Sequence, residues 1–272
     1  QRVARTHTHT QARTIPLRLK VCGGVLIALL CAAAVNWVVA VEKGLRRDAC
    51  AVAHAVLTTA EAPDVPKSAK YAKCRHVFID GGTNRGDTVE AFAGDTPNNE
   101  ISEAREVYLK RIKKTVRDVC YFGFEASKKF NSKLREVQAK YAGRFAHIEL
   151  FGETVLLSKP ENVSYWAGEI ITHQVIVDPR YKEGMSDGVA RGVDLAAFIA
   201  QFSLDSLYLK LDIESSEYAV MRRLLATGQL CQPKRPTHLS IEFHPPKAPS
   251  ELVGDGFLEV VRCCGVVTNV FY

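Results

Sequence analysis

Zinc-binding spacings are missing from this sequence, as are internal repeats and low-complexity tracts. None of its 8 cysteines forms a C-x-x-C pair or clusters with histidine at zinc spacing, which argues against a structural zinc site. Net charge is nearly absent beyond the first 47 residues, because residues 48–272 hold 28 basic and 29 acidic side chains. The sequence pI of about 8.9 therefore reflects the N-terminal region, and nothing in the rest of the chain indicates nucleic-acid binding.

Residues 21–41 form a segment of 21 residues without a charged side chain. This length can cross a bilayer as one helix, and Trp37 lies near one end, where an indole suits the membrane interface. Five basic residues precede the segment and three follow it closely, a bias that favours a cytosolic N-terminus. We therefore predict a cytosolic tail over 1–20 and a transmembrane signal-anchor over 21–41. A cleaved signal peptide, giving a secreted protein, and a buried helix of the domain are the alternatives.

The remaining chain is long enough for one domain of about 200–220 residues, and 47% of the whole sequence is hydrophobic. We expect a stem or linker over 42–73, where two prolines occur and no apolar period is sustained, and a domain over 74–272. A glycosylation sequon at Asn162 and six cysteines outside the predicted span fit a lumenal domain in the secretory pathway. Six cysteines allow fifteen pairings, among which the sequence does not choose.

Strand and helix patterns alternate along the predicted domain. This alternation predicts an α/β fold with a doubly wound, mostly parallel sheet. Residues 159–192 contain two prolines and several glycines, so we expect a loop-rich insertion with one strand near 170–177. The expected strands are 75–79, 119–124, 145–150, 154–157, 206–212, 238–243 and 266–271, and the expected helices are 87–92, 101–117, 130–141, 195–202, 216–226 and 251–264.

A glycine-rich loop follows the first expected strand. It reads Asp80-Gly-Gly-Thr-Asn-Arg-Gly86, with the acid before the glycines. A dinucleotide fingerprint would read G-x-G-x-x-G with its acid about 20 residues later, so a nicotinamide site is disfavoured. The loop is similar to the one that wraps the methionine part of S-adenosylmethionine, although a glycine turn of this kind also occurs in other α/β proteins.

Acidic residues follow three more of the expected strands. Glu125 ends the second strand, where a carboxylate suits a ribose diol, although a helix N-terminal acid is equally consistent with the sequence. Asp212 and Glu214 are expected on one strand face, with Glu217 in the first turn of the next helix. Three carboxylates within six residues repel each other when desolvated, which indicates a cation, a shared proton or a positively charged ligand.

A histidine and a further acid end the next strand, at Glu242 and His244. An imidazole titrates near neutrality, which makes His244 a candidate general base. The alternative is a structural histidine, which is the commoner role of a lone histidine. The catalytic candidates from sequence are therefore Asp212, Glu214, Glu217, Glu242 and His244.

Four of these segments occur in an order that resembles the FkbM-type methyltransferase family over about residues 75–272. They are 78–86, 122–126, 209–217 and 241–244. The resemblance implies a class I Rossmann-like methyltransferase fold and S-adenosylmethionine-dependent methyl transfer, commonly to a hydroxyl oxygen. The positions that match the family's cofactor motifs are Asp80, Gly81, Gly82, Asn84, Gly86 and Glu125.

The resemblance, combined with the predicted lumenal location, implies O-methylation of a glycan, glycoconjugate or small-molecule acceptor. Ser215 and Ser216 stand where the family has Gly-Ala, which leaves a non-catalytic binding module as one alternative. A nicotinamide-dependent enzyme on a similar sheet is the other. The sequence does not decide the acceptor, the requirement for a divalent metal or the oligomeric state.

Overall fold

The computed structural model describes residues 48–55, 58–96, 99–166, 169–171, 186–214, 216–232, 234–244 and 255–271. They belong to one compact unit that runs from Leu45 to Tyr272. The predicted tail and signal-anchor over 1–41 lie outside the described residues. None of the described helices combines the length and the apolar composition needed to cross a bilayer.

A central sheet of six strands organises the domain, and each strand is parallel to its neighbours. In sheet order the strands are β10 (Val267–Phe271), β9 (Thr237–Glu242), β8 (Ser206–Leu211), β1 (His76–Gly81), β2 (Val119–Glu125) and β3 (His147–Gly152). The strand order reverses at the boundary between β1 and β8. This arrangement confirms the predicted doubly wound parallel sheet and is Rossmann-like.

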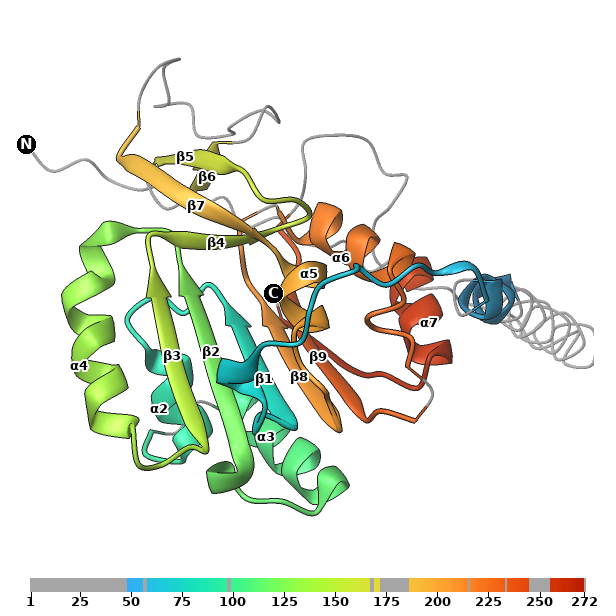
Figure 1. Cartoon of the computed structure of the whole chain (residues 1–272), viewed down its shortest axis with the longest axis horizontal. Helices are drawn as coiled ribbons and strands as arrows, with labels where there is room; N and C mark the ends of the chain where they lie inside the picture. Colours follow the sequence, from blue (N-terminus) through green and yellow to red (C-terminus); the bar gives the residue numbers. More distant parts are fainter. Residues whose placement is uncertain are drawn as a thin grey trace, which may run out of the picture. The chain divides into compact units, whose positions relative to one another are not determined.

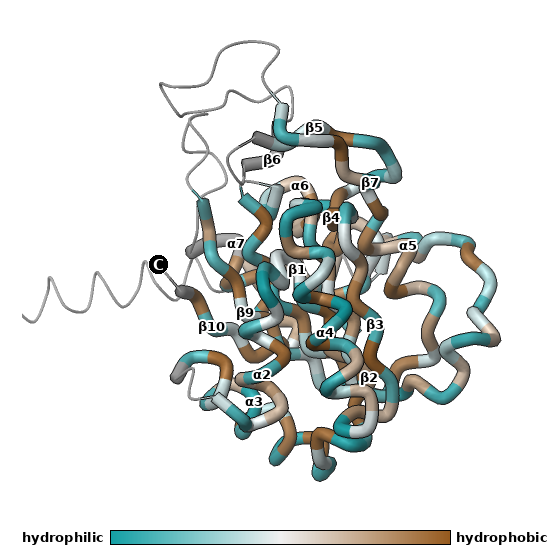
Figure 2. The backbone as a smooth tube through the Cα atoms, turned by 90° about the vertical axis from the view of Figure 1, so that its left-hand side faces the viewer, coloured by the Kyte–Doolittle hydropathy of each residue, from teal (hydrophilic) through white to brown (hydrophobic). Residues whose placement is uncertain are grey.

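Helices cover both faces of this sheet, as Figure 1 shows. On one face Phe78 of β1 packs 4.5 Å from Phe92 and 4.4 Å from Tyr208, measured between ring centroids. The neighbouring residues Val77 and Ile79 point to the other face and its separate hydrophobic core. Figure 2 shows hydrophobic residues concentrated along the strands. The first face carries α2 (Asp87–Ala93), α3 (Asn99–Ile112) and α4 (Asn131–Tyr141), and the second carries α5 (Leu195–Ala200), α6 (Glu217–Ala226) and α7 (Asp255–Cys263).

A second, four-stranded sheet follows β3 directly. Its order is β4 (Thr154–Leu157), β7 (Gly188–Asp194), β5 (Asn162–Trp166) and β6 (Glu169–Ile171). β4 and β7 are parallel, whereas β5 is antiparallel to both of its neighbours. The prediction of a loop-rich insertion with one strand is therefore wrong for the described part of 159–192. β6 ends at Ile171, and residues 172–185 lie outside the described residues.

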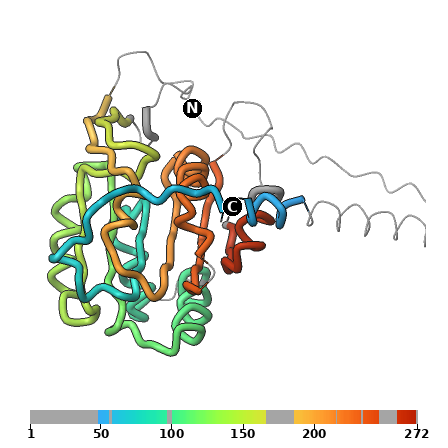
Figure 3. The backbone as a smooth tube through the Cα atoms, turned by 45° about the vertical axis from the view of Figure 1, so that its right-hand side comes forward, coloured from blue at the N-terminus to red at the C-terminus, as the bar shows by residue number. Residues whose placement is uncertain are grey.

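The described part of the expected stem packs against the domain. Residues 48–55 are helical and lie beside α7 (Figure 3). Ala49 and Ala53 of this helix are buried in one cluster with Val260 of α7. Further along, Lys67 Nζ donates hydrogen bonds to the carbonyl oxygens of Ala200 and Phe202, at 2.8 and 2.6 Å. Packing of this kind makes the segment a part of the domain rather than a spacer extending from it.

Three disulfides pair all six cysteines outside the predicted membrane span. Cys74–Cys120 joins the segment just before β1 to β2, and Cys50–Cys263 ties the stem helix to α7. Cys231–Cys264 ties the segment after α6 to the end of α7. The structure thus selects one pairing where the sequence left the choice open.

Candidate functional site

The carboxyl ends of β1, β2, β8 and β9 meet at one edge of the sheet. Open α/β sheets bind ligands in the crevice outside this edge, next to the reversal of strand order, here between β1 and β8. The residues predicted to form the site lie at the ends of these strands or in the segments that follow them, except Glu217, which is the first residue of α6 (Glu217–Ala226). These segments are the glycine turn (residues 81–86), Glu125, the loop 212–216 and residues 242–244.

Close backbone packing explains the glycines of the turn. Gly82 has a φ of 77°, and a Cβ there would overlap the carbonyl oxygen of Asp212, so the turn lies directly against the loop after β8. Gly86 has a φ of 92° at the N-terminus of α2. Asn84 also takes a left-handed φ, of 54°, which asparagine adopts more readily than most residues. The turn therefore uses the residue types that its conformation requires.

Asp80 lies in β1, next to this turn, and is completely buried. The Tyr121 hydroxyl donates a hydrogen bond of 2.6 Å to Asp80 Oδ2, and Lys210 Nζ lies 3.3 Å from Oδ1. The same ammonium group donates to the carbonyl oxygen of Gly82 at 3.1 Å and reaches Asp212 Oδ2 at 3.4 Å. Asp80 thus supports the turn through Lys210, while its own carboxylate reaches no exposed surface.

Glu125 is held against the glycine turn by backbone hydrogen bonds. The N–H of Asn84 donates to Glu125 Oε2 at 2.9 Å, and the N–H of Ser127 donates to Oε1 at 2.7 Å. Burial raises the pKa of Glu125, an effect that these two hydrogen bonds oppose. The carboxylate keeps further lone pairs for a diol. Because α4 begins only at Asn131, Glu125 is not in its first turn, so the helix-terminus explanation does not apply.

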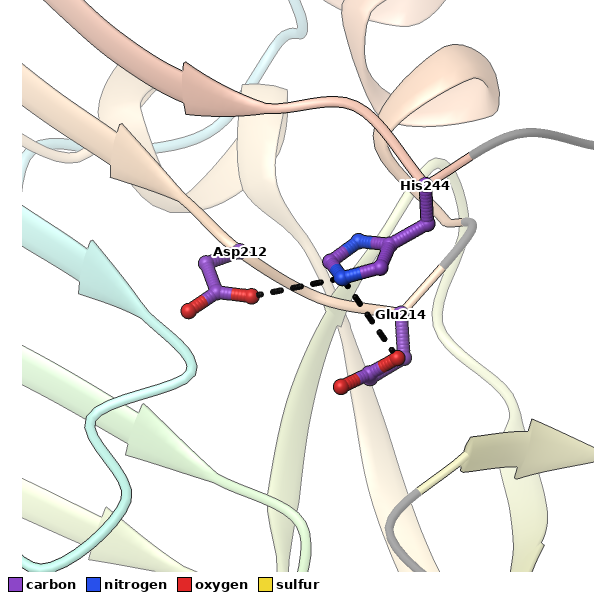
Figure 4. A group of neighbouring side chains, drawn as sticks. All are labelled: Asp212, Glu214 and His244. Carbon is purple, nitrogen blue, oxygen red and sulfur yellow. Dashed lines mark ion pairs between the residues drawn. The ribbon is translucent and has the colours of Figure 1, made fainter. Parts of the chain in front are cut away.

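Four carboxylates surround one imidazole beyond the carboxyl ends of β8 and β9. β8 ends at Leu211, so Asp212 and Glu214 lie in a loop and the predicted shared strand face is wrong. The loop still brings both to His244, whose Nε2 lies 3.9 Å from Asp212 Oδ1 and 3.6 Å from Glu214 Oε2 (Figure 4). Glu242, the last residue of β9, places Oε1 3.6 Å from the same nitrogen.

Glu217 contacts the other ring nitrogen of His244. Its carboxylate is completely buried in the first turn of α6, where Oε1 lies 3.1 Å from His244 Nδ1 and accepts a 2.7 Å hydrogen bond from the N–H of Ile213. The hydrogen bond to Glu217 and the charges of Glu217, Glu214 and Asp212 outweigh burial and raise the pKa of His244 to about 9. The imidazole is therefore a cation at neutral pH, which does not suit the general-base role predicted for His244 from the sequence.

Two residues of the site were not predicted from the sequence. Lys210 bridges Asp80 and Asp212, and Tyr121 fixes Asp80. Lys210 gave a usable signal, because a lysine inside a strand that is otherwise apolar or uncharged is rarely buried without a charged partner. The sequence gives no such signal for Tyr121, because an aromatic residue in a buried strand is normally interpreted as part of the hydrophobic core.

The arrangement offers two kinds of binding chemistry. The glycine turn and Glu125 present a backbone surface with a carboxylate beside it, which suits a ribose and its attached chain. Asp212, Glu214 and His244 each offer one ligand atom, and these atoms lie within 4.8 Å of one another, a spacing that could hold a metal ion.

Two cavities in the described part of the chain lie elsewhere. One, of about 250 Å³, is lined by residues of α4 and β3, including Leu134 and Leu150. The other, of about 470 Å³, lies between the stem segment and α5 and includes Lys67 and Phe202. Neither of these two cavities is lined by a residue of the glycine turn or of the carboxylate cluster.

Comparison with protein-family models, with curated proteins and with solved structures found no match.

Proposed function

We propose that this chain binds S-adenosylmethionine at the glycine turn and transfers its methyl group to a hydroxyl oxygen. The observation that carries the proposal is the 2.9 Å hydrogen bond from the N–H of Asn84 to Glu125 Oε2. It joins the turn that would receive the methionine part to the carboxylate that would receive the ribose diol. The resemblance of four segments to FkbM-type methyltransferases supports the same assignment.

Charge supports a cationic ligand over a phosphorylated one. The carboxylates of Glu125, Asp212, Glu214 and Glu242 all lie at the carboxyl-terminal edge of the sheet, and a sulfonium carries a positive charge that complements them. The first turn of α2 also carries acids at positions 87 and 90. A dinucleotide would bring its pyrophosphate to this helix N-terminus, where those acids would repel it.

The reaction needs an aligned acceptor and a place for one proton. The acceptor oxygen attacks the methyl carbon, the bond from that carbon to sulfur breaks, and the cofactor leaves as a neutral thioether. His244 is already protonated at neutral pH, so we assign the general base to Asp212. His244 then serves as a positioning residue that holds Asp212 and Glu214 together, with Glu217 behind it.

The proposed acceptor is a glycan or glycoconjugate in the secretory pathway. Three disulfides within one domain suit an oxidising compartment, and the sequon at Asn162 lies at an exposed position at the start of β5. The uncharged segment 21–41 would anchor the domain to the membrane. A secreted form cleaved after that segment would reach the same acceptors.

A nicotinamide dinucleotide is the second candidate, because the strand order is also the one found in dinucleotide-binding domains. The glycine spacing and the acidic first turn of α2 argue against it. A thermal shift from NAD larger than that from S-adenosylmethionine would favour this candidate.

The test is methyl transfer by the full chain in detergent, with a tritiated methyl donor and a pool of glycans and glycolipids. We expect label that survives alkali, because a methyl ether resists conditions that cleave methyl esters. Asp212→Asn should lose transfer while still binding the cofactor, and Glu136→Gln, on the exposed face of α4, is the matched control. Cofactor binding without transfer to any acceptor would instead indicate a non-catalytic binding module.

A further inference from the structure

We propose that Asp212, Glu214, Glu242 and His244 form a binding site for a divalent cation. The imidazole is the common centre, since its Nε2 lies 3.9, 3.6 and 3.6 Å from one oxygen of Asp212, Glu214 and Glu242. Glu242 ends β9 and His244 follows it, while Asp212 and Glu214 follow the neighbouring strand β8, so the pairing of these two strands brings the four residues together. In Figure 4 the Nε2 atom faces the carboxylates of Asp212 and Glu214.

These spacings are close to those of a coordination sphere. Ligand atoms about 2.1 Å from a metal lie about 3.0 Å apart at an octahedral edge and about 3.4 Å apart at a tetrahedral one. The atoms of Asp212, Glu214 and His244 already lie within 4.8 Å of one another. All four side chains are partly exposed, which leaves a path for an ion and room for the small rotations that coordination requires.

Glu217 supplies an independent reason to expect a ligand at His244. Its carboxylate is completely buried, and its Oε2 has no hydrogen-bond partner among the described residues. Its Oε1 accepts from Ile213 N–H and contacts His244 Nδ1, which fixes the ring and holds a proton on Nδ1, so that a metal ion would replace the proton on Nε2. A carboxylate behind a histidine in this way is the usual second layer of a metal site, because it orients the lone pair of the other nitrogen.

Lys210 leaves the site open to a cation. It reaches Asp212 through Oδ2, whereas Oδ1 is the oxygen that faces His244. One carboxylate can therefore hold the lysine and a metal at the same time. Glu214 and Glu242 place two further negative charges around the imidazole of His244, and a divalent cation would balance them.

The ligand set selects the class of metal. Three carboxylate oxygens and one imidazole nitrogen suit Mn²⁺, while a thiolate, typical of closed zinc sites, is not among the ligands. The role of the ion rests on the proposed function. A bound cation would coordinate the acceptor hydroxyl and lower its pKa, so the proton would pass more readily to Asp212, the general base of the proposed reaction.

The experiment measures Mn²⁺ binding by the full chain without cofactor or acceptor, so it is independent of methyl transfer. The chain is first dialysed against a chelator, and free Mn²⁺ is followed by electron paramagnetic resonance. We expect a single site that is lost in His244→Ala and in Glu242→Gln. Glu217→Gln keeps all four ligands but loosens His244, and should weaken binding by about 10- to 100-fold.

His147→Ala is the matched control, because that histidine also contacts a carboxylate, Glu149 at 3.3 Å, but at the start of β3. Thermal unfolding in chelator shows whether each variant folds. Binding that is equal in the wild type, the folded His244→Ala variant and the folded Glu242→Gln variant would overturn the proposal. So would the absence of Mn²⁺ binding by the wild-type chain.

Discussion

Lys210 Nζ lies 3.3 Å from Asp80 Oδ1 and 3.4 Å from Asp212 Oδ2, and Lys210 and Asp80 are both buried. Burial alone would lower the pKa of Lys210, but the two carboxylates outweigh that effect and raise it. The ammonium group also donates to the carbonyl oxygen of Gly82. One side chain thus joins the glycine turn to the loop that carries the carboxylate cluster.

Lys210→Met should destabilise the domain strongly, because it leaves the buried carboxylate of Asp80 without its cation. Loss of one partner of a buried pair costs about 3–5 kcal/mol. Urea unfolding measures the change, and Lys133→Met, which removes an exposed 3.9 Å pair with Glu136, should cost less than about 1 kcal/mol. Equal effects of the two substitutions would contradict the structural role of Lys210.

The double variant Lys210→Met, Asp80→Asn should recover part of that loss. Removing the orphaned charge relieves the desolvation cost, so the two substitutions should not be additive and should differ from the sum by about 1–3 kcal/mol. Strict additivity in a double-mutant cycle would show that the two side chains do not interact.

Gly82→Ala should abolish cofactor binding and lower stability by about 2 kcal/mol or more, because the residue has a positive φ and a Cβ would overlap the Asp212 carbonyl. Gly143→Ala is the control, since a Cβ there meets nothing within 4 Å. Calorimetry with S-adenosylmethionine and thermal unfolding measure both effects. If Gly82→Ala bound S-adenosylmethionine as tightly as the wild type, the glycine turn would not be part of the cofactor site.

Local pattern was enough to predict the central sheet. Most of its strands are rich in apolar residues, and β9 alternates polar residues with Leu239 and Ile241, so the predicted strands match β1, β2, β3, β8, β9 and β10 to within a few residues. The helix predicted over 101–117 ends earlier, at Ile112, because Lys113 adopts a left-handed φ of 56°. Nothing in the charged sequence around Lys113 signals that stop.

The second sheet could not be predicted in the same way. β7 contains Gly188, Gly192 and Arg191, a composition with low strand propensity. It is a strand because it pairs with β4 on one side and β5 on the other. Those partners are distant in sequence, and the glycine at 192 is needed where a Cβ would overlap the backbone oxygen of Glu161.

The site was predictable as a list of residues but not as a geometry. The sequence indicated that Asp212, Glu214, Glu217, Glu242 and His244 would gather at one edge, and the structure brings them together around His244. The depth of Asp80 was not predictable, because the rings and the ammonium group that enclose it come from β2 and β8. Their register against β1 is a tertiary property.

His238 should make the domain sensitive to mild acid. Burial, with a smaller contribution from Arg111, lowers the pKa of His238 from 6.5 to about 4. The folded state therefore resists protonation of His238. The contribution of this group to the free energy of unfolding is fully present above pH 6.5 and is lost as the pH falls toward 4. The loss attributable to this group reaches about 3 kcal/mol.

Urea unfolding between pH 7.5 and about 4 measures this loss as the difference between the wild type and His238→Gln. The variant removes the titrating ring, so its stability should fall less steeply over the same range. Parallel curves for the two proteins would show that His238 does not contribute to acid sensitivity.

The Cys50–Cys263 disulfide should stabilise the docking of the stem helix. It closes a loop with a sequence separation of 213, and its removal by Cys50→Ser with Cys263→Ser should cost about 2–4 kcal/mol. Proteolysis would then begin in the segment around residues 48–60, next to the freed helix.

Peptide mapping without reductant should find all three disulfides in protein from the secretory pathway, and free thiols at these positions would contradict the lumenal proposal.

The most direct test of the central claim is calorimetric titration of the full chain with S-adenosylmethionine. We predict micromolar-range binding that is lost in Glu125→Ala and kept in Glu136→Ala, a control whose side chain is 66% exposed on α4. Wild-type binding that persists unchanged in Glu125→Ala, or a wild-type chain that binds NAD more tightly than S-adenosylmethionine, would contradict it.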